Sequence, residues 1–250
     1  MDEIRREDFE IGKSRRESDW SETEETMRED FEIGKSRRET DEPKKEDEND
    51  KTEKMACTCG NCNATDFYPK NKKSISCRHC HQVIIPENLE EAKEIPAPKR
   101  IKQILLLNQM AEKNPDVPQI PMALGIFYLT NGAYQYALPQ FKKAVELDPM
   151  NADAYYYTAV SLLGGVKPFI KNLKQIQEIV ENLNLAEQLE PKAVYYYLHA
   201  YVAYDYYKRK FMGCNPSYSE LLSQARASGI TAKEIADLFE LLKTDKPTNF

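Results

Sequence analysis

Long apolar runs are absent from this 250-residue sequence. The longest run of aliphatic side chains, Ile104-Leu105-Leu106-Leu107, is about one helical turn, whereas a membrane-spanning helix needs about 18 apolar residues. The first six residues are mostly charged and no apolar stretch follows them, unlike a secretory signal peptide. We therefore expect no membrane-spanning segment, no membrane partner and a cytoplasmic location.

Residues typical of catalytic centres are also scarce. The chain has only three histidines, and it shows no nucleophile motif and no cleft-like pair of carboxylates. Two Gly-Lys-Ser triplets occur, but a phosphate-binding loop places another glycine five residues before the first residue of the triplet. Glu7 and Glu29 occupy those positions. The sequence predicts a protein that is not an enzyme.

Charge is divided unevenly along the chain. Residues 1–54 carry 21 acidic and 13 basic side chains, whereas residues 55–250 carry 20 and 22. The nearly neutral second part gives no support for broad affinity to nucleic acid, so nucleic-acid partners are disfavoured. In the first part, the few bulky apolar residues bury too little surface to offset the entropy of ordering. We expect residues 1–54 to be a disordered charged tail.

This charged tail contains one exact duplication. The twelve residues REDFEIGKSRRE at positions 6–17 recur at positions 28–39. In each copy, acidic residues surround an aromatic and an aliphatic side chain. These are Phe9 and Ile11 in the first copy, and Phe31 and Ile33 in the second. Two interpretations stay open: recent duplication of tolerated sequence, or a tandem linear motif whose linked copies raise the effective concentration for a two-site partner.

Five of the six cysteines lie between residues 57 and 80. Four of them form two C-x2-C pairs separated by 14 residues: Cys59, Cys62, Cys77 and Cys80. Two such pairs supply the four thiolates of a closed, tetrahedral zinc site, which leaves no open position for a catalytic water. In a chain that is not exported, metal binding is favoured over disulfides. We expect zinc as the cofactor, in a structural role.

The sequence around these cysteines favours short strands. β-forming residues lie on both sides of a Lys/Asn-rich turn near residue 72, and Val83-Ile84-Ile85 predicts a further strand. The segment resembles a zinc ribbon. Whether Cys57 or His81 could replace one of the four zinc ligands stays open. A modest cluster of lysines in the turn would give weak, salt-sensitive binding to nucleic acid.

From residue 100 onward, apolar residues recur at three- and four-residue spacing, with Pro or Gly between the periodic stretches. Residues 123–149 resemble a tetratricopeptide repeat. Small residues such as Gly125 lie where its two helices would cross, large ones such as Phe141 would fill the gaps, and Pro149 would end the second helix. Pro139, inside that helix, departs from the family pattern.

The resemblance continues toward the end of the chain. A second unit spans residues 154–191 with about eight extra residues around position 166, and a third opens at residue 193. Further helices are expected at 101–112, 216–227 and 232–242, the last preceded by a Thr-x-x-Glu capping box. Stacked pairs of this kind form a solenoid in which neighbours bury one another.

The predicted fold is mostly α, an antiparallel helix-pair solenoid preceded by a small β zinc ribbon and a disordered tail. The predicted boundaries are a tail at 1–54, a zinc ribbon at 55–90, a linker at 91–99 and a helical domain at 100–250.

In the tetratricopeptide family, the first helix of each pair lines a concave peptide-binding groove. The resemblance assigns eight residues of this chain to that groove: Met122, Ile126, Leu129, Tyr156, Val160, Leu163, Leu198 and Val202. Their apolar character disfavours clamping of a carboxylate and favours an apolar or helical peptide. We expect a non-catalytic adaptor or scaffold for protein partners. The alternative is a nucleic-acid-binding zinc-ribbon protein whose helical array recruits a partner.

Overall fold

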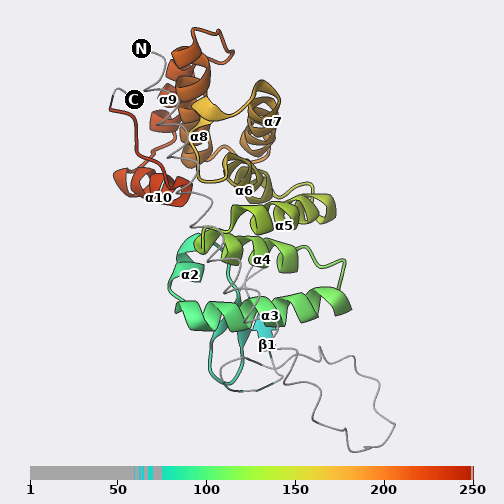
Figure 1. The fold of residues 1–250 in the computed structure, drawn as a ribbon. Coiled ribbons are helices and arrows are strands. Elements are labelled where there is room, and N and C mark those ends of the chain that lie inside the picture. Colours follow the sequence, from blue (N-terminus) through green and yellow to red (C-terminus); the bar gives the residue numbers. More distant parts are fainter. Residues whose placement is uncertain (1–58, 60–61, 63, 65–66, 70–74, 249) are drawn as a thin grey trace, which may run out of the picture. The chain divides into compact units, whose positions relative to one another are not determined.

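The computed structural model describes Cys59, Cys62, Ala64 and residues 67–69, 75–248 and 250 (Figure 1). The charged tail, its duplicated motif and Cys57 lie outside the described residues. The described part is mostly helical, with three short strands near its start. None of its helices is both long enough and apolar enough to cross a membrane.

The strands form one antiparallel sheet in the order β1-β2-β3, with β1 at Phe67–Pro69, β2 at Ile75–Cys77 and β3 at Val83–Ile85. The strands expected on the two sides of the turn and the additional strand are all present, and the turn itself lies outside the described residues. The last two residues of β3 are buried, and the Gln103 side-chain amide donates a hydrogen bond to the Val83 carbonyl. The sheet is thereby attached to the first long helix.

Two helices occupy most of residues 91–99, the stretch predicted to be a linker. α2 spans Leu89–Lys93 and α3 spans Ala97–Lys113. Ile95, between them, is buried. Pro98 lies in the first turn of α3, where a missing N–H costs nothing because that group has no partner inside the helix. The proline-rich sequence therefore begins a helix instead of separating domains.

The remaining helices follow the predicted pairs closely. Their bounds are α4 Gln119–Thr130, α5 Tyr134–Leu147, α6 Ala152–Leu163, α7 Leu173–Leu189, α8 Ala193–Val202, α9 Tyr218–Ala227 and α10 Ala232–Leu242. From α3 to α9, each helix packs against the next one along the chain, as Figure 1 shows. This serial packing is the arrangement expected of stacked helix pairs.

α4 and α5 cross closely at Gly125, where the sequence predicted it. A Cβ atom on this residue would lie 2.6 Å from the ring of Phe141. Phe141 is fully buried and also stacks on Tyr157 of α6, with ring centroids 5.3 Å apart. One aromatic side chain on α5 thus fills the space between α4 and α6, and glycine is what lets it fit.

The extra residues of the second unit form a compact turn between α6 and α7. The turn begins with Gly164 in the left-handed region (φ 60°) and includes a short 3-10 helix, Pro168–Ile170. The Phe169 N–H donates to the Asp205 carboxylate at 2.8 Å. Asp205 belongs to a π-helical turn, Ala203–Tyr207, that continues α8. This hydrogen bond joins the α6–α7 turn to the segment after α8.

Candidate metal centre and helix-binding face

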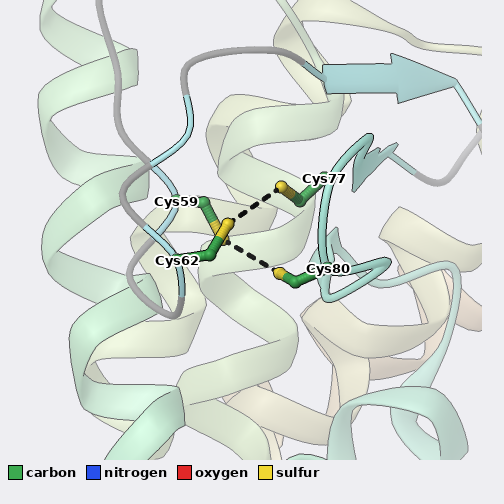
Figure 2. A group of neighbouring side chains, drawn as sticks. All are labelled: Cys59, Cys62, Cys77 and Cys80. Atoms are coloured by element: carbon green, nitrogen blue, oxygen red, sulfur yellow. Dashed lines mark hydrogen bonds between the residues drawn. The ribbon is translucent and has the colours of Figure 1, made fainter.

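The four predicted metal ligands converge at one point (Figure 2). The Sγ atoms of Cys59 and Cys80 are 3.6 Å apart, as are those of Cys62 and Cys77. All four sulfur atoms lie within 4.8 Å of one another. Thiolates held at about 2.3 Å around one tetrahedral zinc ion would be separated by roughly 3.8 Å. The cluster therefore has dimensions that could hold a single metal ion.

Local backbone geometry brings these sulfur atoms together. The Cys59 N–H donates to the Ala64 carbonyl at 2.7 Å, which closes the first turn. At the second turn, the Cys77 N–H donates to the Gln82 carbonyl at 2.9 Å, and the His81 N–H donates to the Cys77 carbonyl at 3.0 Å. His81 lies in the left-handed region (φ 56°), so it reverses the chain behind the second C-x2-C pair.

The surroundings of the Cys62 thiol oppose ionisation when no cation is present. A backbone hydrogen bond from Ala64 favours the thiolate, but desolvation and hydrogen bonds with the other three thiols outweigh it and raise the Cys62 pKa to about 12. A bound divalent cation reverses this balance, because it stabilises each thiolate directly. Four adjacent thiols of this kind are chemically suited to a soft or borderline metal ion.

The structure does not form the predicted open groove. Seven of its eight residues are at most 5% exposed: Ile126, Leu129, Tyr156, Val160, Leu163, Leu198 and Val202. In this conformation these seven side chains are therefore not open to a ligand. Their apolar character, which suggested a peptide-binding surface, instead comes from their place in the core between helices.

The C-terminal helix α10 packs against α8. Its Phe239 ring makes edge contacts with Tyr197 and Tyr201 of α8, at centroid separations of 6.4 and 5.1 Å. In the same last turn of α10, the Leu241 carbonyl accepts a hydrogen bond of 2.6 Å from the hydroxyl of Tyr134, which lies at the start of α5. α10 therefore bridges the first and third helix pairs, and Figure 1 shows it beside the array between α8 and α2.

Charged residues at the rim of α10 pair with α2. Lys93 lies 3.1 Å from Glu240, and Lys233 lies 2.6 Å from Glu90. Both pairs are largely exposed, so each contributes at most about 1 kcal/mol. The apolar side of α10 is buried through four residues: Leu238, Phe239, Leu241 and Leu242. The combination is an amphipathic helix with an apolar centre and a charged rim.

The helix itself was predicted, but not its place. Its capping box, Thr231 with Glu234, and its bounds at 232–242 are confirmed. Apolar residues spaced three and four apart, from Ile235 to Leu242, were the available signal that one side of this helix must be covered. The periodicity does not specify which part of the chain covers this apolar side, because that depends on contacts between residues far apart in the sequence.

Met122 is the one predicted groove residue that stays partly exposed. It lines a pocket of about 270 Å³ at the start of α4, together with Met150 and the side chains of Glu87, Asp148 and Glu190. Asp153, at the same pocket, is engaged by the Lys192 ammonium at 2.8 Å. The acidic residues that line this pocket distinguish it from the aromatic surface of α8 that α10 covers.

Comparisons with known proteins give limited help. No protein-family model and no curated protein matches the sequence. Among solved structures, "MamA MSR-1 C2" is similar at 21% identity over 61% of this chain and 78% of that one, with a TM-score of 0.38. "MamA AMB-1 P212121" (19%, 60% and 78%, 0.39) and "MamA 41-end from Desulfovibrio magneticus RS-1" (17%, 62% and 75%, 0.38) are comparable. Similarity this weak carries no functional argument.

Proposed function

We propose that this chain is a non-catalytic protein-interaction adaptor whose tetratricopeptide-like array binds an amphipathic helix from its partner. The observation that carries the proposal is the packing of α10. The array already accommodates one amphipathic helix, through an aromatic anchor, Phe239, between two tyrosines of α8. Helix-in-groove recognition of this kind uses apolar anchors at three- and four-residue spacing, which α10 has.

On this proposal, α10 is a built-in occupant that a partner helix replaces. Four buried apolar side chains and two exposed ion pairs hold α10, and only the short turn at residues 228–231 joins it to α9. A partner with the same apolar spacing would satisfy the same aromatic face. Its affinity would be reduced by the fraction of molecules in which α10 is in place.

A peptide of residues 230–246 provides a direct test. The full chain carrying Phe239→Ala and Leu242→Ala should bind the fluorescently labelled peptide in a saturable manner. The unaltered chain should bind it much more weakly, because its own α10 competes. The matched control is Ala236→Ser on the exposed side of α10, which should behave like the unaltered chain. Equal binding by all three chains, or by none, would remove the support for a helix-binding face.

We propose further that Cys59, Cys62, Cys77 and Cys80 hold a structural zinc ion in a zinc-ribbon-like module. The convergence of the four sulfur atoms supports this, as does the attachment of β3 to α3 through Gln103. With four protein thiolates the coordination shell is full, so the ion would stabilise the fold without activating water. Elemental analysis of purified full-length chain should give one zinc per chain.

The duplicated tail motif is proposed as a second contact for the same class of partner. The support is the exact repetition of acidic residues around Phe9 and Ile11, and around Phe31 and Ile33. Replacing one pair with alanine should weaken capture of a partner modestly, and replacing both pairs should abolish the gain from linkage. If all variants capture the partner equally well, the tail motif takes no part in recognition, and residues 100–250 alone bind the partner.

A further inference from the structure

Exposed apolar residues are concentrated in two segments of the helical domain. Among the described residues, five of the eight exposed large apolar side chains lie in residues 164–174 and 206–219: Phe169, Ile170, Leu173, Phe211 and Met212. The first segment is the α6–α7 turn with the start of α7, and the second joins α8 to α9. We call these two segments together the basic-apolar patch.

The two segments are held side by side. Besides the hydrogen bond from the Phe169 N–H to Asp205, the Arg209 guanidinium lies 4.4 Å from the centre of the Phe169 ring. The Lys210 ammonium lies 5.1 Å from the same ring and 3.7 Å from the Tyr206 ring. These contacts join Phe169 of the first segment to Arg209 and Lys210 of the second, so the two segments lie side by side.

The charge of the basic-apolar patch has one sign. Its two segments contain six basic residues and no acidic residue: Lys167, Lys171, Lys174, Lys208, Arg209 and Lys210. Two acids border the second segment. Asp205 is buried and already pairs with Arg209, and the Glu220 carboxylate accepts hydrogen bonds from Ser217 in the cap of α9. Burial lowers the pKa of Lys171, which is the direction expected for a cation without a compensating acid. The surface therefore favours an anionic partner.

Phe211 is presented to solvent at a conformational cost. Its side chain is 99% exposed, so it makes almost no contact within the fold. Its backbone lies in the left-handed region (φ 57°), which is unfavourable for a residue with a Cβ atom. A strained backbone residue with an unburied aromatic side chain does not stabilise the fold. Backbone outliers of this kind concentrate at functional sites.

We propose that the basic-apolar patch binds the surface of an anionic lipid bilayer, with Phe211 entering the interface and the lysines meeting the headgroups. Exposed apolar side chains ringed by Lys and Arg are the combination that interfacial membrane binding uses. Phe211 protrudes, so it is suited to entering a soft interface and not to receiving a partner's side chain. Nucleic-acid surfaces use aromatic stacking but offer little to exposed aliphatic residues such as Ile170 and Leu173. The sequence-based expectation of no membrane partner rested on spanning segments, which this mode of binding does not need.

Co-sedimentation of the full chain with vesicles tests the proposal. Vesicles of phosphatidylcholine with about one third phosphatidylserine should bind the chain, and pure phosphatidylcholine vesicles should not. Each lysine near an anionic surface contributes roughly a factor of five, so Lys167→Gln with Lys174→Gln should weaken binding about 25-fold. Phe211→Asn, which tolerates the left-handed backbone, should weaken it by about tenfold or more.

The matched control replaces two exposed lysines elsewhere. Lys99→Gln with Lys102→Gln on α3 changes the net charge by the same amount, and it should leave vesicle binding nearly unaltered. Far-ultraviolet circular dichroism of every variant should match that of the unaltered chain. Within the described part of the chain none of the four lysines forms an ion pair, and Phe211 is unburied. Raising the salt to roughly 1 M, where the Debye length falls to about 3 Å, should release most of the chain.

Three results would overturn the proposal. The first is no binding to phosphatidylserine vesicles by the unaltered chain. The second is equal loss of binding in the α3 control, which would indicate a general charge effect. The third is binding of single-stranded RNA or of polyglutamate that depends on Lys167 and Lys174 while the vesicles stay unbound, since the surface would then serve a different polyanion.

Discussion

Replacing Phe239 with alanine should release α10 selectively. Phe239 is 8% exposed and its ring contacts two tyrosines of α8. Removing a buried phenylalanine costs about 3–5 kcal/mol in a rigid core. Since α10 is the last helix, it can detach instead of leaving a cavity, so we take the lower figure of about 3 kcal/mol. That lowers the ratio of docked to detached α10 by roughly 100-fold.

Native-state hydrogen exchange measures this ratio residue by residue. The backbone amides in the last two turns of α10 should lose roughly 100-fold in protection, in line with the lost contact energy. The backbone amides of α5 should keep most of their protection, because α5 is buried in the array by Ala137, Phe141 and Ala144. The contrast between the two helices is the informative quantity, because a general loss of stability would lower both.

Phe211→Ala is the matched control, since it removes the same side chain from a position that is 99% exposed. Surface substitutions of this kind alter stability by at most about 0.5 kcal/mol. The reasoning is refuted if Phe239→Ala lowers protection in α5 as much as in α10. That result would mean that α10 belongs to one cooperative unit with the array and is not separately replaceable.

Cys62→Ser should abolish zinc retention in elemental analysis while the circular dichroism of the helices persists, and one retained zinc per chain would contradict the ligand assignment. Gly125→Ala should cost about 1–3 kcal/mol in denaturant unfolding through overpacking against Phe141. Phe141→Leu in the same chain should recover part of that cost, and strictly additive losses would place the strain elsewhere. Burial raises the pKa of Tyr134 to about 12, above its ordinary value, so folding favours its neutral form. The Tyr134–Leu241 contact should therefore be fully stable below about pH 10 and weaken as the pH rises toward 12. Tyr134→Phe should reduce the alkaline dependence of unfolding by the contribution of this residue, while buried tyrosines with a similarly raised pKa, such as Tyr201, keep theirs.

Sequence periodicity predicted the helix pairs well, because each pair forms through local contacts. The expected second helix at 216–227 begins two residues later, at Tyr218, since Ser217 caps it together with Glu220. Gly125 and Phe141 were correctly identified as a close crossing. Features that depend on packing within one repeat, such as helix bounds and the crossing at Gly125, could therefore be predicted from the local sequence.

The structure differs most from the expectations where the outcome depends on contacts between distant segments. Pro98 suggested a linker, yet a proline in the first turn of a helix is favourable, so α3 begins there. Val160 and Leu198 were assigned to a groove because they are apolar and lie on the first helices of their pairs. Apolar residues at such positions satisfy a groove and a core equally well, and no local feature showed that α10 would return to this side.

α8 and its continuation support both proposed surfaces. Tyr201 contacts Phe239 of α10, and Asp205, one turn later, holds the basic-apolar patch through Phe169 and Arg209. A shared helix is a physical route for coupling, and any coupling in binding free energy must be equal in both directions. Phe239→Ala combined with Phe211→Asn measures it in the vesicle assay. If the losses of binding free energy in the two single variants add up to that of the double variant within about 0.5 kcal/mol, the two surfaces are independent. Additivity of this kind is expected for sites that share no partners. A larger departure from additivity would show that α8 transmits the state of α10 to the patch.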